Sequence, residues 1–465
     1  MKIFNSLTQT FFTPPDSWSR RVIRMFVCGP TVYDLPHIGH ARTYIAFDMI
    51  ARWLRTSGYR LKYVQNITDI DDKLIDRAAK ENISVKKLAA INTRAYHRTE
   101  KDLNITSVNA YKPATGAIKE IIKQITTLLK KGFAYETDDG IYFHVASFKN
   151  YGALSRQNIK ALRTGTRAKI HENKKDPLDF ALWKKTPDNK STPTAPAWKS
   201  PWGWGRPGWH IEDTAITEKC FGPQYEIHGG ADELKFPHHE AEIAQQESSS
   251  GKTPMVQLWM HTGVLFVNGQ KMSKSLGNFI TVDDFIATYD ADTLRLMILS
   301  HLYRSPIDYT ETAAHAAHAG WMTLHGFLRK LVFVTENSKA KGSPSDDITK
   351  THEAFESAMD NDFHTPRALA ALFELIKKTE PHVFELSSKQ AGSLYNVIAG
   401  SLEVLGFDDT TPSYVPPSTV YNLARKRERA RKNTQFVQAD VLREKIERLG
   451  YKIDDTPIGP YLYKQ

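Results

Sequence analysis

The stretch VIRMFVCGPTVYDLPHIGHARTYIAFDMIARWLRTSGYRLKYVQNIT, residues 22–68, predicts a strand, a helix and a second strand in succession. Val22–Cys28 is mostly apolar and is followed by Gly-Pro, as expected for a buried strand that ends there. Apolar side chains recur with helical periodicity from about His40 to Arg55, and Leu61–Thr68 again favours a strand. Two strands joined by a helix form a βαβ unit, normally a right-handed crossover in a parallel sheet. Ligands bind beyond the carboxyl ends of such strands, where Cys28 and Thr68 fall.

The rest of the sequence predicts further strands and helices after this βαβ unit. Phe133–Thr137 and Ile141–Val145 predict a hairpin, and residues from about Arg163 to Gly208 are rich in Lys, Pro, Gly and Trp. Strand and helix signals resume from Trp209 to about Val267, and beyond Asp283 the pattern is nearly all helical.

We therefore predict an α/β protein with a Rossmann-type parallel-sheet domain and a C-terminal, mainly helical domain. The expected parts are the Rossmann-type domain over residues 1–270 with an irregular insertion at about 133–208, a loop with connecting helices over 271–309, and the helical domain with a small extension over 310–465.

The charge and the cysteine content narrow the class of protein. The formal charge of +10 favours a polyanionic partner, although a generally basic surface explains it equally well. Cys28 and Cys220 are too few for a disulfide framework. No apolar run is long enough for a membrane span or a signal segment, so we expect a cytoplasmic protein.

Two short motifs suit a nucleoside triphosphate. His37-Ile38-Gly39-His40 stands where the first strand's loop enters the helix, and a helix N-terminus attracts phosphate. Lys271-Met272-Ser273-Lys274-Ser275 follows a strand-like segment, and its lysines can stabilise a leaving pyrophosphate. Alone, the first motif is often only a polar helix cap, and the second is better explained as an exposed basic loop. Together, in this order, they are the two signatures of class I aminoacyl-tRNA synthetases, which predicts His37, His40, Lys271 and Lys274 as catalytic and His37, His40 and Lys274 as ATP-binding.

Three further residues have the chemistry of a metal site. His238 and Glu242 are four residues apart in a helical pattern and project from one face. Cys28 supplies a thiolate at the end of the first strand. All three side chains are zinc ligands, although a buried free cysteine and a solvated helix face would give the same spacing.

The sequence resembles the cysteinyl-tRNA synthetases over nearly its whole length. The matching segments are CGPTVYDLPHIGHART (28–43), NITDIDDK (66–73), RPGWHIED (206–213), IHGGADELKFPHHEAEIAQ (227–245), KMSKSLGNF (271–279) and MDNDFHTPRALAALFELI (359–376). The last of these resembles the start of the family's helical anticodon-binding domain, so the resemblance assigns residues 310–465 to tRNA binding.

The resemblance implies a reaction and a set of substrates. Cysteine and ATP, with Mg²⁺, would form cysteinyl-adenylate, and the cysteinyl group would pass to tRNA(Cys). One Zn²⁺ ion would bind the sulfur of the substrate, and Thr68, Trp209 and His228 would line that pocket. Zinc would distinguish cysteine from serine at the binding step, because a hydroxyl ionises less readily and suits the metal less well. We expect a monomer.

Two positions depart from the family's pattern. The family's second metal-binding cysteine directly follows Gly-Trp-His-Ile-Glu, and here that position is Asp213. An aspartate keeps the charge of the ligand set, so we predict a metal site of Cys28, Asp213, His238 and Glu242; a local hydrogen-bonding role for Asp213 is the alternative. Glu233 stands where the family more often has aspartate, which leaves the contacts to the amino group of the substrate open.

Two other functions are compatible with the catalytic motifs. A ligase on the same scaffold could deliver cysteinyl-adenylate to a small amine, but it would not need the helical residues from about Thr310 to Gln465. A non-catalytic tRNA-binding paralogue would not be expected to keep His37, His40, Lys271 and Lys274. Cysteine-dependent pyrophosphate exchange, with and without tRNA, distinguishes the three.

Overall fold

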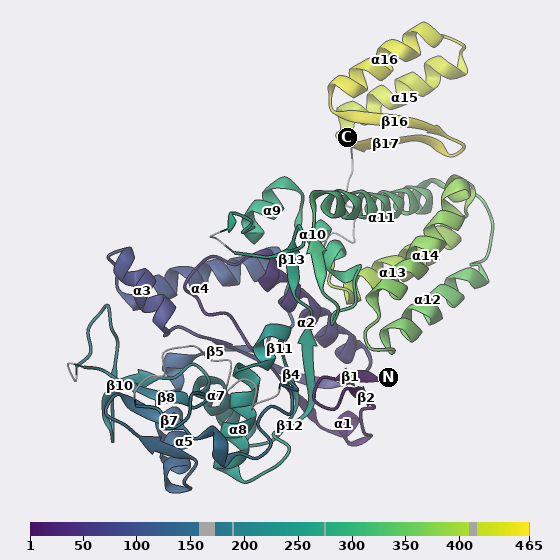
Figure 1. Cartoon of the computed structure of the whole chain (residues 1–465). Coiled ribbons are helices and arrows are strands. Elements are labelled where there is room, and N and C mark those ends of the chain that lie inside the picture. The colour runs from purple at the N-terminus through teal and green to yellow at the C-terminus, as the bar shows by residue number, and fades with distance from the viewer. Residues whose placement is uncertain (158–172, 188–189, 274–275, 409–415, 465) are drawn as a thin grey trace. The chain divides into compact units, whose positions relative to one another are not determined.

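The computed structural model describes residues 1–157, 173–187, 190–273, 276–408 and 416–464 (Figure 1). The chain divides into two compact units. The first is Met1–Glu311 together with Asp360–Phe363, and the second is Thr312–Met359 with His364–Gln465. No helix of the described chain is both long enough and apolar enough to cross a lipid bilayer.

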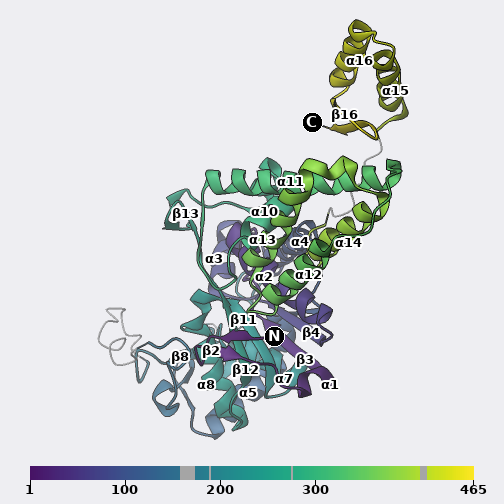
Figure 2. The same ribbon diagram turned by 90° about the vertical axis from the view of Figure 1, so that its right-hand side faces the viewer.

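A five-stranded parallel sheet forms the centre of the first unit (Figure 2). Its order is β12 (Val256–Thr262), β11 (Tyr225–Ala231), β3 (Val22–Val27), β4 (Arg60–Ile67) and β5 (Ala110–Pro113). Helix α2 (Ile38–Thr56) joins β3 to β4, so the predicted βαβ unit is confirmed. Its apolar positions Ile45, Met49 and Ile50 are fully buried.

Helices and short elements complete the first unit. They are β1 (Ile3–Asn5), β2 (Thr10–Phe12), α1 (Ser17–Arg20), α3 (Asp72–Lys80), α4 (Val85–Asp102), α5 (Ile118–Lys130), α7 (Ile211–Phe221), α8 (His238–Ser250), α9 (Val282–Thr288) and α10 (Ala291–Leu299). A small sheet of β14 (Gln270–Lys271), β13 (Leu265–Val267) and β15 (Ile307–Tyr309) precedes the second unit in the chain.

The prediction that the insertion at about residues 133–208 is irregular is wrong for its described part. Its strands form an antiparallel sheet. Its order is β6 (Ala134–Glu136), β7 (Gly140–Phe143), β8 (Phe180–Lys185), β10 (Gly203–Pro207) and β9 (Trp198–Ser200), and the predicted hairpin is β6–β7. The glycines mark close backbone approach rather than irregularity. A Cβ on Gly205 would lie 2.4 Å from the Lys184 carbonyl oxygen, and one on Gly208 would lie 1.8 Å from that of Ala181. Residues 158–172 of the predicted insertion lie outside the described chain.

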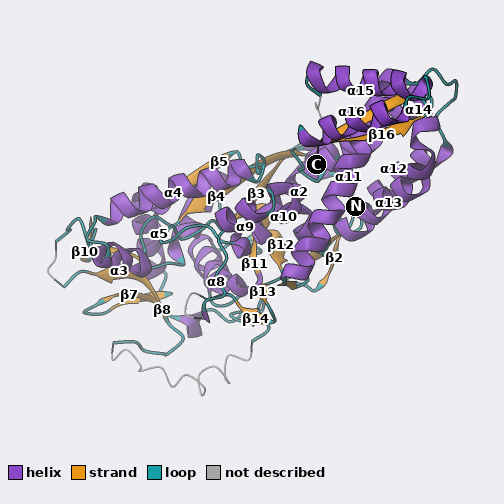
Figure 3. Cartoon of the chain, turned by 90° about the horizontal axis from the view of Figure 1, so that it is seen from above, coloured by secondary structure: helices purple, strands orange, loops and turns teal. Residues whose placement is uncertain are grey.

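The second unit is mainly helical, as predicted. Its helices are α11 (Glu311–Asn337), α12 (Asp346–Met359), α13 (Thr365–Thr379), α14 (Ser388–Val404), α15 (Ser418–Lys432) and α16 (Phe436–Arg448). The chain then forms an antiparallel pair, β16 (Tyr451–Thr456) and β17 (Gly459–Lys464), which the sequence pattern did not reveal (Figure 3). Val420, Ala424, Ile446, Ile453 and Leu462 form a small core between this pair and the last two helices.

Candidate active site and metal cluster

A cavity of about 330 Å³ opens at the carboxyl ends of the central strands. Residues from every matching segment of the first unit contribute to it. The cavity is lined by Cys28, Gly29, Pro30, Thr31, Tyr33, His37, Gly39, His40, Thr43, Tyr44, Lys73, Trp209, Ala231, Glu233, Leu234, Gly263, Val264, Leu265, Lys271 and Met272.

His37 and His40 form a reciprocal cap at the start of α2. His37 Nδ1 accepts from the backbone amides of Gly39 (3.1 Å) and His40 (3.3 Å), and His40 Nδ1 accepts from the amide of His37 (3.3 Å). The two rings stack with their centroids 3.7 Å apart. Burial lowers the pKa of His40 well below its usual value, and His37 lowers it further. An imidazole that accepts at Nδ1 carries its proton on Nε2, so each ring has a donor suited to phosphate or ribose oxygens.

The start of α2 is also tied to the chain that follows the lysine motif. Ile38 N donates to the carbonyl of Ile280 (3.1 Å), and Val282 N donates to that of Pro36 (3.1 Å). The ring of His37 packs edge-on against Phe279, with the centroids 5.1 Å apart. Lys271 ends β14 and forms an ion pair with Glu233. Lys274 and Ser275 lie outside the described residues.

The side chains of the four predicted metal ligands lie close together beside the cavity, which one of them, Cys28, lines. Cys28 Sγ lies 3.3 Å from Asp213 Oδ2 and 3.8 Å from Glu242 Oε1. His238 Nε2 lies 3.0 Å from both Asp213 Oδ2 and Glu242 Oε1. Cys28 comes from the end of β3, Asp213 from the first turn of α7, and the other two from α8. All four side chains are buried.

A fifth donor, His239, was not predicted. His239 Nε2 lies 3.1 Å from Cys28 Sγ, and Cys28, His238, His239 and Glu242 offer ligand atoms that all lie within 4.8 Å of one another. His239 Nδ1 is 2.8 Å from His261 Nε2, and His238 Nδ1 is 2.9 Å from His210 Nδ1. Such outer partners fix the ring orientation of ligating histidines. His239 precedes Glu242 by three residues, a helical spacing that would have identified it.

The electrostatics of the cluster suit a cation. Burial raises the pKa of the Cys28 thiol well above its usual value, and Glu242 and Asp213 raise it further. Burial lowers the pKa of His238, but Glu242 and Asp213 outweigh it and bring this pKa to about 9. Asp213 Oδ1 and Glu242 Oε2 are buried without a hydrogen-bond partner. Buried carboxylate oxygens are costly unless a positive charge compensates them, so the donor set fits a metal ion.

The three predicted substrate residues occupy different depths. Trp209 is 38% exposed, lines the cavity, and stacks on His238 with centroids 4.4 Å apart. Thr68 and His228 are not among the residues that line this cavity. Thr68 is buried, with its hydroxyl donating to Glu212 Oε2 (3.1 Å). His228 lies behind Cys28, with Nε2 3.6 Å from Sγ.

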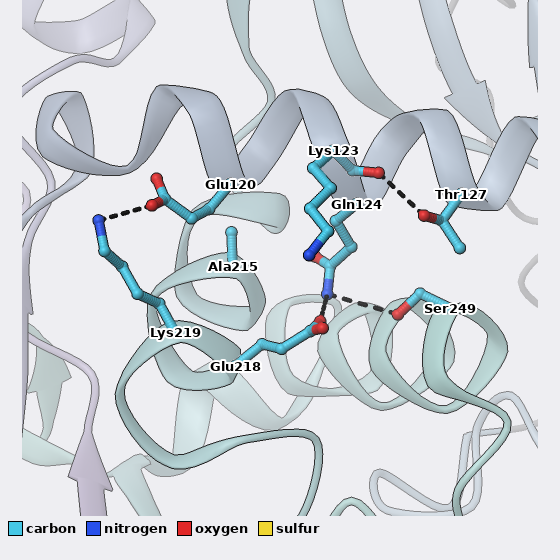
Figure 4. Close-up of a pocket in the computed structure, with 8 residues that line it drawn as sticks. All are labelled: Glu120, Lys123, Gln124, Thr127, Ala215, Glu218, Lys219 and Ser249. Carbon is cyan, nitrogen blue, oxygen red and sulfur yellow. Dashed lines mark hydrogen bonds and ion pairs between the residues drawn. The ribbon is translucent and has the colours of Figure 1, made fainter.

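A second cavity, of about 320 Å³, lies between α5, α7 and α8 (Figure 4). Several of its polar side chains pair with one another. Lys219 pairs with Glu120 (2.6 Å), and Gln124 Nε2 donates to Glu218 (3.0 Å) and Ser249 (3.4 Å).

Comparison with known proteins defines the class. Residues 15–319 match the family described as the tRNA synthetases class I (C) catalytic domain, and residues 354–407 match the DALR domain. The fold is similar to methionyl-tRNA synthetase of Mycobacterium tuberculosis in complex with methionyl-adenylate (TM-score 0.60, 16% identity, 83% of this chain and 91% of that one). It is also similar to the LeuRS AgnB2 of Agrobacterium radiobacter K84 in a ternary complex with tRNA and LeuAMS (TM-score 0.62, 12% identity, 83% and 84%). Fold and motifs together define a class I aminoacyl-tRNA synthetase.

Curated relatives identify the member of that class. The cysteine–tRNA ligase of Thermoplasma volcanium is 40% identical over 455 residues, covering 98% of both chains. That of Thermococcus gammatolerans is 40% identical over 479 residues, covering 99% of this chain and 98% of the other. The chain belongs to the cysteine–tRNA ligase family and is an enzyme of the ligase type, as the sequence predicted.

Proposed function

We propose that the chain activates cysteine with ATP and Mg²⁺ and then transfers the cysteinyl group to tRNA(Cys), acting in the cytoplasm as a monomer. One observation carries the proposal. Cys28 belongs both to the metal-ligand cluster and to the lining of the cavity that His37 and His40 share. A substrate thiol bound at the cluster therefore has its carboxylate on the side of the ATP motifs.

The ATP side of the cavity is built from backbone and imidazole donors. The N-terminus of α2 presents a positive dipole end, and the Nε2–H groups of His37 and His40 hydrogen-bond phosphate or ribose oxygens. Lys271, with Lys274 of the same loop, stabilises the charge that develops on the leaving pyrophosphate. The carboxylate of cysteine attacks the α-phosphorus and pyrophosphate leaves, so no protein side chain becomes covalently modified. Positioning and charge stabilisation therefore carry the catalysis.

The cysteine side of the cavity is proposed to hold one Zn²⁺ ion. Cys28, Asp213, His238 and Glu242 would be its ligands, because their buried donors combine a thiolate, an imidazole and carboxylates. When bound, zinc supplies a soft Lewis acid that prefers the thiolate of cysteine to the hydroxyl of serine. The ring of Trp209 stacks on that of His238, and His228 Nε2 lies 3.6 Å from Cys28 Sγ. The hydroxyl of Thr68 donates to Glu212, the residue before the proposed ligand Asp213.

The second unit is proposed to bind tRNA. Its helix α15 carries Arg425, Lys426, Arg429, Arg431 and Lys432 within a single stretch. Contacts of such cations with phosphates release counterions and supply affinity that does not depend on sequence.

Pyrophosphate exchange tests the proposal directly. Labelled pyrophosphate should enter ATP when cysteine is present and negligibly when serine replaces it at the same concentration. Exchange should not need tRNA, whereas formation of cysteinyl-tRNA should. Equal exchange rates with cysteine and serine would overturn the metal–thiolate account of specificity, and the absence of any exchange would overturn the activation step.

A further inference from the structure

Two like charges face each other where the antiparallel sheet of the insertion meets the start of α3. Lys184 of β8 and Arg206 of β10 are directly opposed in the pairing of these two strands. Like charges in directly opposed positions destabilise an antiparallel pair. The carboxylate of Asp72, the first residue of α3, forms an ion pair with each of them, through one oxygen to Lys184 and the other to Arg206. Asp72 therefore compensates their repulsion from outside the sheet.

The Asp72 carboxylate is ionised in this arrangement. Burial raises its pKa, but the hydrogen bonds from Lys184 and Arg206 outweigh burial and hold the pKa below its usual value. The Asp72 side chain is 48% exposed and that of Arg206 is 21% exposed, so solvent weakens the ion pairs. These three residues are not among those that line the active-site cavity. They affect the cavity through the residues that they hold in place.

The chain that follows Arg206 leads directly to the cavity. Trp209 lies three residues further on, and the segment between them is held closely to β8. Gly208 N donates to the carbonyl of Leu182 (2.9 Å), and a Cβ on Gly208 would lie 1.8 Å from another carbonyl oxygen of β8. Trp209 then lines the cavity and stacks on His238. Because this segment is bound to β8, a displacement of the two strands relative to α3 displaces Trp209 as well.

We propose that Asp72 is a positioning residue for the cysteine side of the active site. By holding Lys184 and Arg206 against α3, it fixes the end of β10 and with it the place of Trp209 over His238. This inference rests on the proposed function, in which Trp209 lines the pocket for cysteine. The predicted ATP motifs lie at the start of α2 and at β14, so the affinity for the nucleotide does not depend on Asp72. Exposed ion pairs are weak, so the effect on cysteine affinity is modest, about two- to fivefold.

The experiment measures equilibrium binding to the full-length enzyme by isothermal titration calorimetry. The two ligands, titrated separately, are cysteine and α,β-methylene-ATP with Mg²⁺, in which the bond broken during adenylate formation is replaced. Asp72→Asn keeps the shape of the side chain but removes its charge, so it should weaken cysteine binding by about two- to fivefold and leave nucleotide binding unchanged. The matched control is Glu136→Gln. Glu136 is 50% exposed and pairs with Lys185, also on β8 (2.8 Å), and its substitution should change neither affinity.

Two double variants test whether Asp72 acts by this route. In a Trp209→Ala background, Asp72→Asn should weaken cysteine binding no further, because the side chain that it positions is gone. Asp72→Arg alone brings three cations together and should weaken cysteine binding more than Asp72→Asn does. Combined with Arg206→Asp, it places an anion between two cations again, and cysteine affinity should return to the wild-type value.

The outcomes separate this inference from the proposed function. Cysteine that binds the wild type no better than serine would overturn the proposed function. With specific cysteine binding in the wild type, the positioning role alone would be overturned by unchanged cysteine affinity in Asp72→Asn, or by equal weakening of both ligands. It would also be overturned if Asp72→Asn had the same effect with and without Trp209, or if Trp209→Ala left cysteine affinity unchanged.

Loss of fold is identified by circular dichroism melting curves of each variant. If Asp72→Asn did not fold, Arg206→Gln would replace it, because this substitution breaks the same cluster from the side of the sheet and should weaken cysteine binding selectively. Unchanged cysteine affinity in a folded Arg206→Gln protein would overturn the positioning role. A folded charge-exchanged variant that bound cysteine no better than Asp72→Arg would overturn it too.

Discussion

Asp213 and His239 are two candidates for one ligand position. Each lies close to Cys28 Sγ, at 3.3 Å and 3.1 Å respectively, and a tetrahedral zinc site with Cys28, His238 and Glu242 needs only one of them. Asp213 Oδ1 is buried without a partner, whereas both ring nitrogens of His239 have neighbours in hydrogen-bonding range. A buried carboxylate therefore needs the cation more than the imidazole does, which favours Asp213.

Substitution of each candidate decides between them. Asp213→Ala should lose bound zinc and raise the cysteine concentration needed for exchange by more than about tenfold, with ATP affinity retained. Asp213→Cys should restore or tighten zinc binding, because sulfur is the softer donor. His239→Asn should retain zinc. Elemental analysis of the three purified variants measures occupancy. Full zinc in Asp213→Ala together with its loss from His239→Asn would assign the position to the histidine.

The residues of the site were predictable to different degrees. His238 and Glu242 were predicted from their helical spacing, Cys28 from its place at the end of the first strand, and Asp213 from the family pattern alone. The structure brings all four together. His239 was missed because only the spacing of four residues was considered. The pairing of Lys271 with Glu233 joins residues 38 positions apart, and no local pattern in the sequence encodes such a contact.

The elements were predicted well where local periodicity determines them. Helix α2 and its flanking strands β3 and β4 have apolar patterns that match their buried faces, so their order and type were correct. The strand β10 was missed because its glycines, one of which allows a close approach to β8, resemble loop residues. Composition alone does not separate a glycine that allows a close approach from one that allows a turn.

Helix α2 gives a test of the cap that holds the ATP motif. A Cβ on Gly39 would lie 2.9 Å from Cε1 and Nδ1 of His37 and 3.2 Å from Cε of Met272. Gly39→Ala should therefore displace the His37 ring and lower the exchange rate by about 100-fold, since misplacing a reacting group by about 1 Å has that effect. Zinc content should not change.

A second glycine variant controls for the general effect of adding a methyl group to a helix. Gly326 lies within α11, and a Cβ there would meet nothing within 4 Å. Gly326→Ala should leave exchange unchanged and raise the free energy of unfolding by about 0.5–1 kcal/mol. If Gly39→Ala behaved like Gly326→Ala, the His37 cap would have no part in catalysis.

The two compact units are not two continuous stretches of the sequence. Asp360–Phe363 separates α12 from α13 in sequence but belongs to the first unit. The carboxylate of Asp362 accepts from Phe4 N (2.8 Å), the Tyr303 hydroxyl (3.0 Å) and Arg304 Nε (2.8 Å). The periodicity of a sequence does not predict such contacts between residues far apart in the chain. They also mean that a fragment ending near residue 311 would lose part of its own unit, so tRNA binding is best tested in the full chain.

Charge removal from α15 tests the proposed tRNA-binding role of the second unit. Lys426 and Arg429 are exposed cations on this helix. If each neutralises one RNA phosphate, the combined substitution Lys426→Ala and Arg429→Ala should weaken tRNA binding and reduce its dependence on salt. The slope of log affinity against log salt concentration should fall by about 1.4–1.8, the value for two phosphates. Filter binding over an about fourfold range of salt concentration measures this slope. Cysteine-dependent exchange without tRNA should stay at the wild-type rate, because neither residue belongs to the first unit.

The matched control is Lys426→Arg with Arg429→Lys, which keeps both charges and should keep the slope. A slope that the alanine substitutions leave unchanged would show that α15 is a solvated basic helix, and the RNA-binding surface would then have to lie elsewhere in the chain.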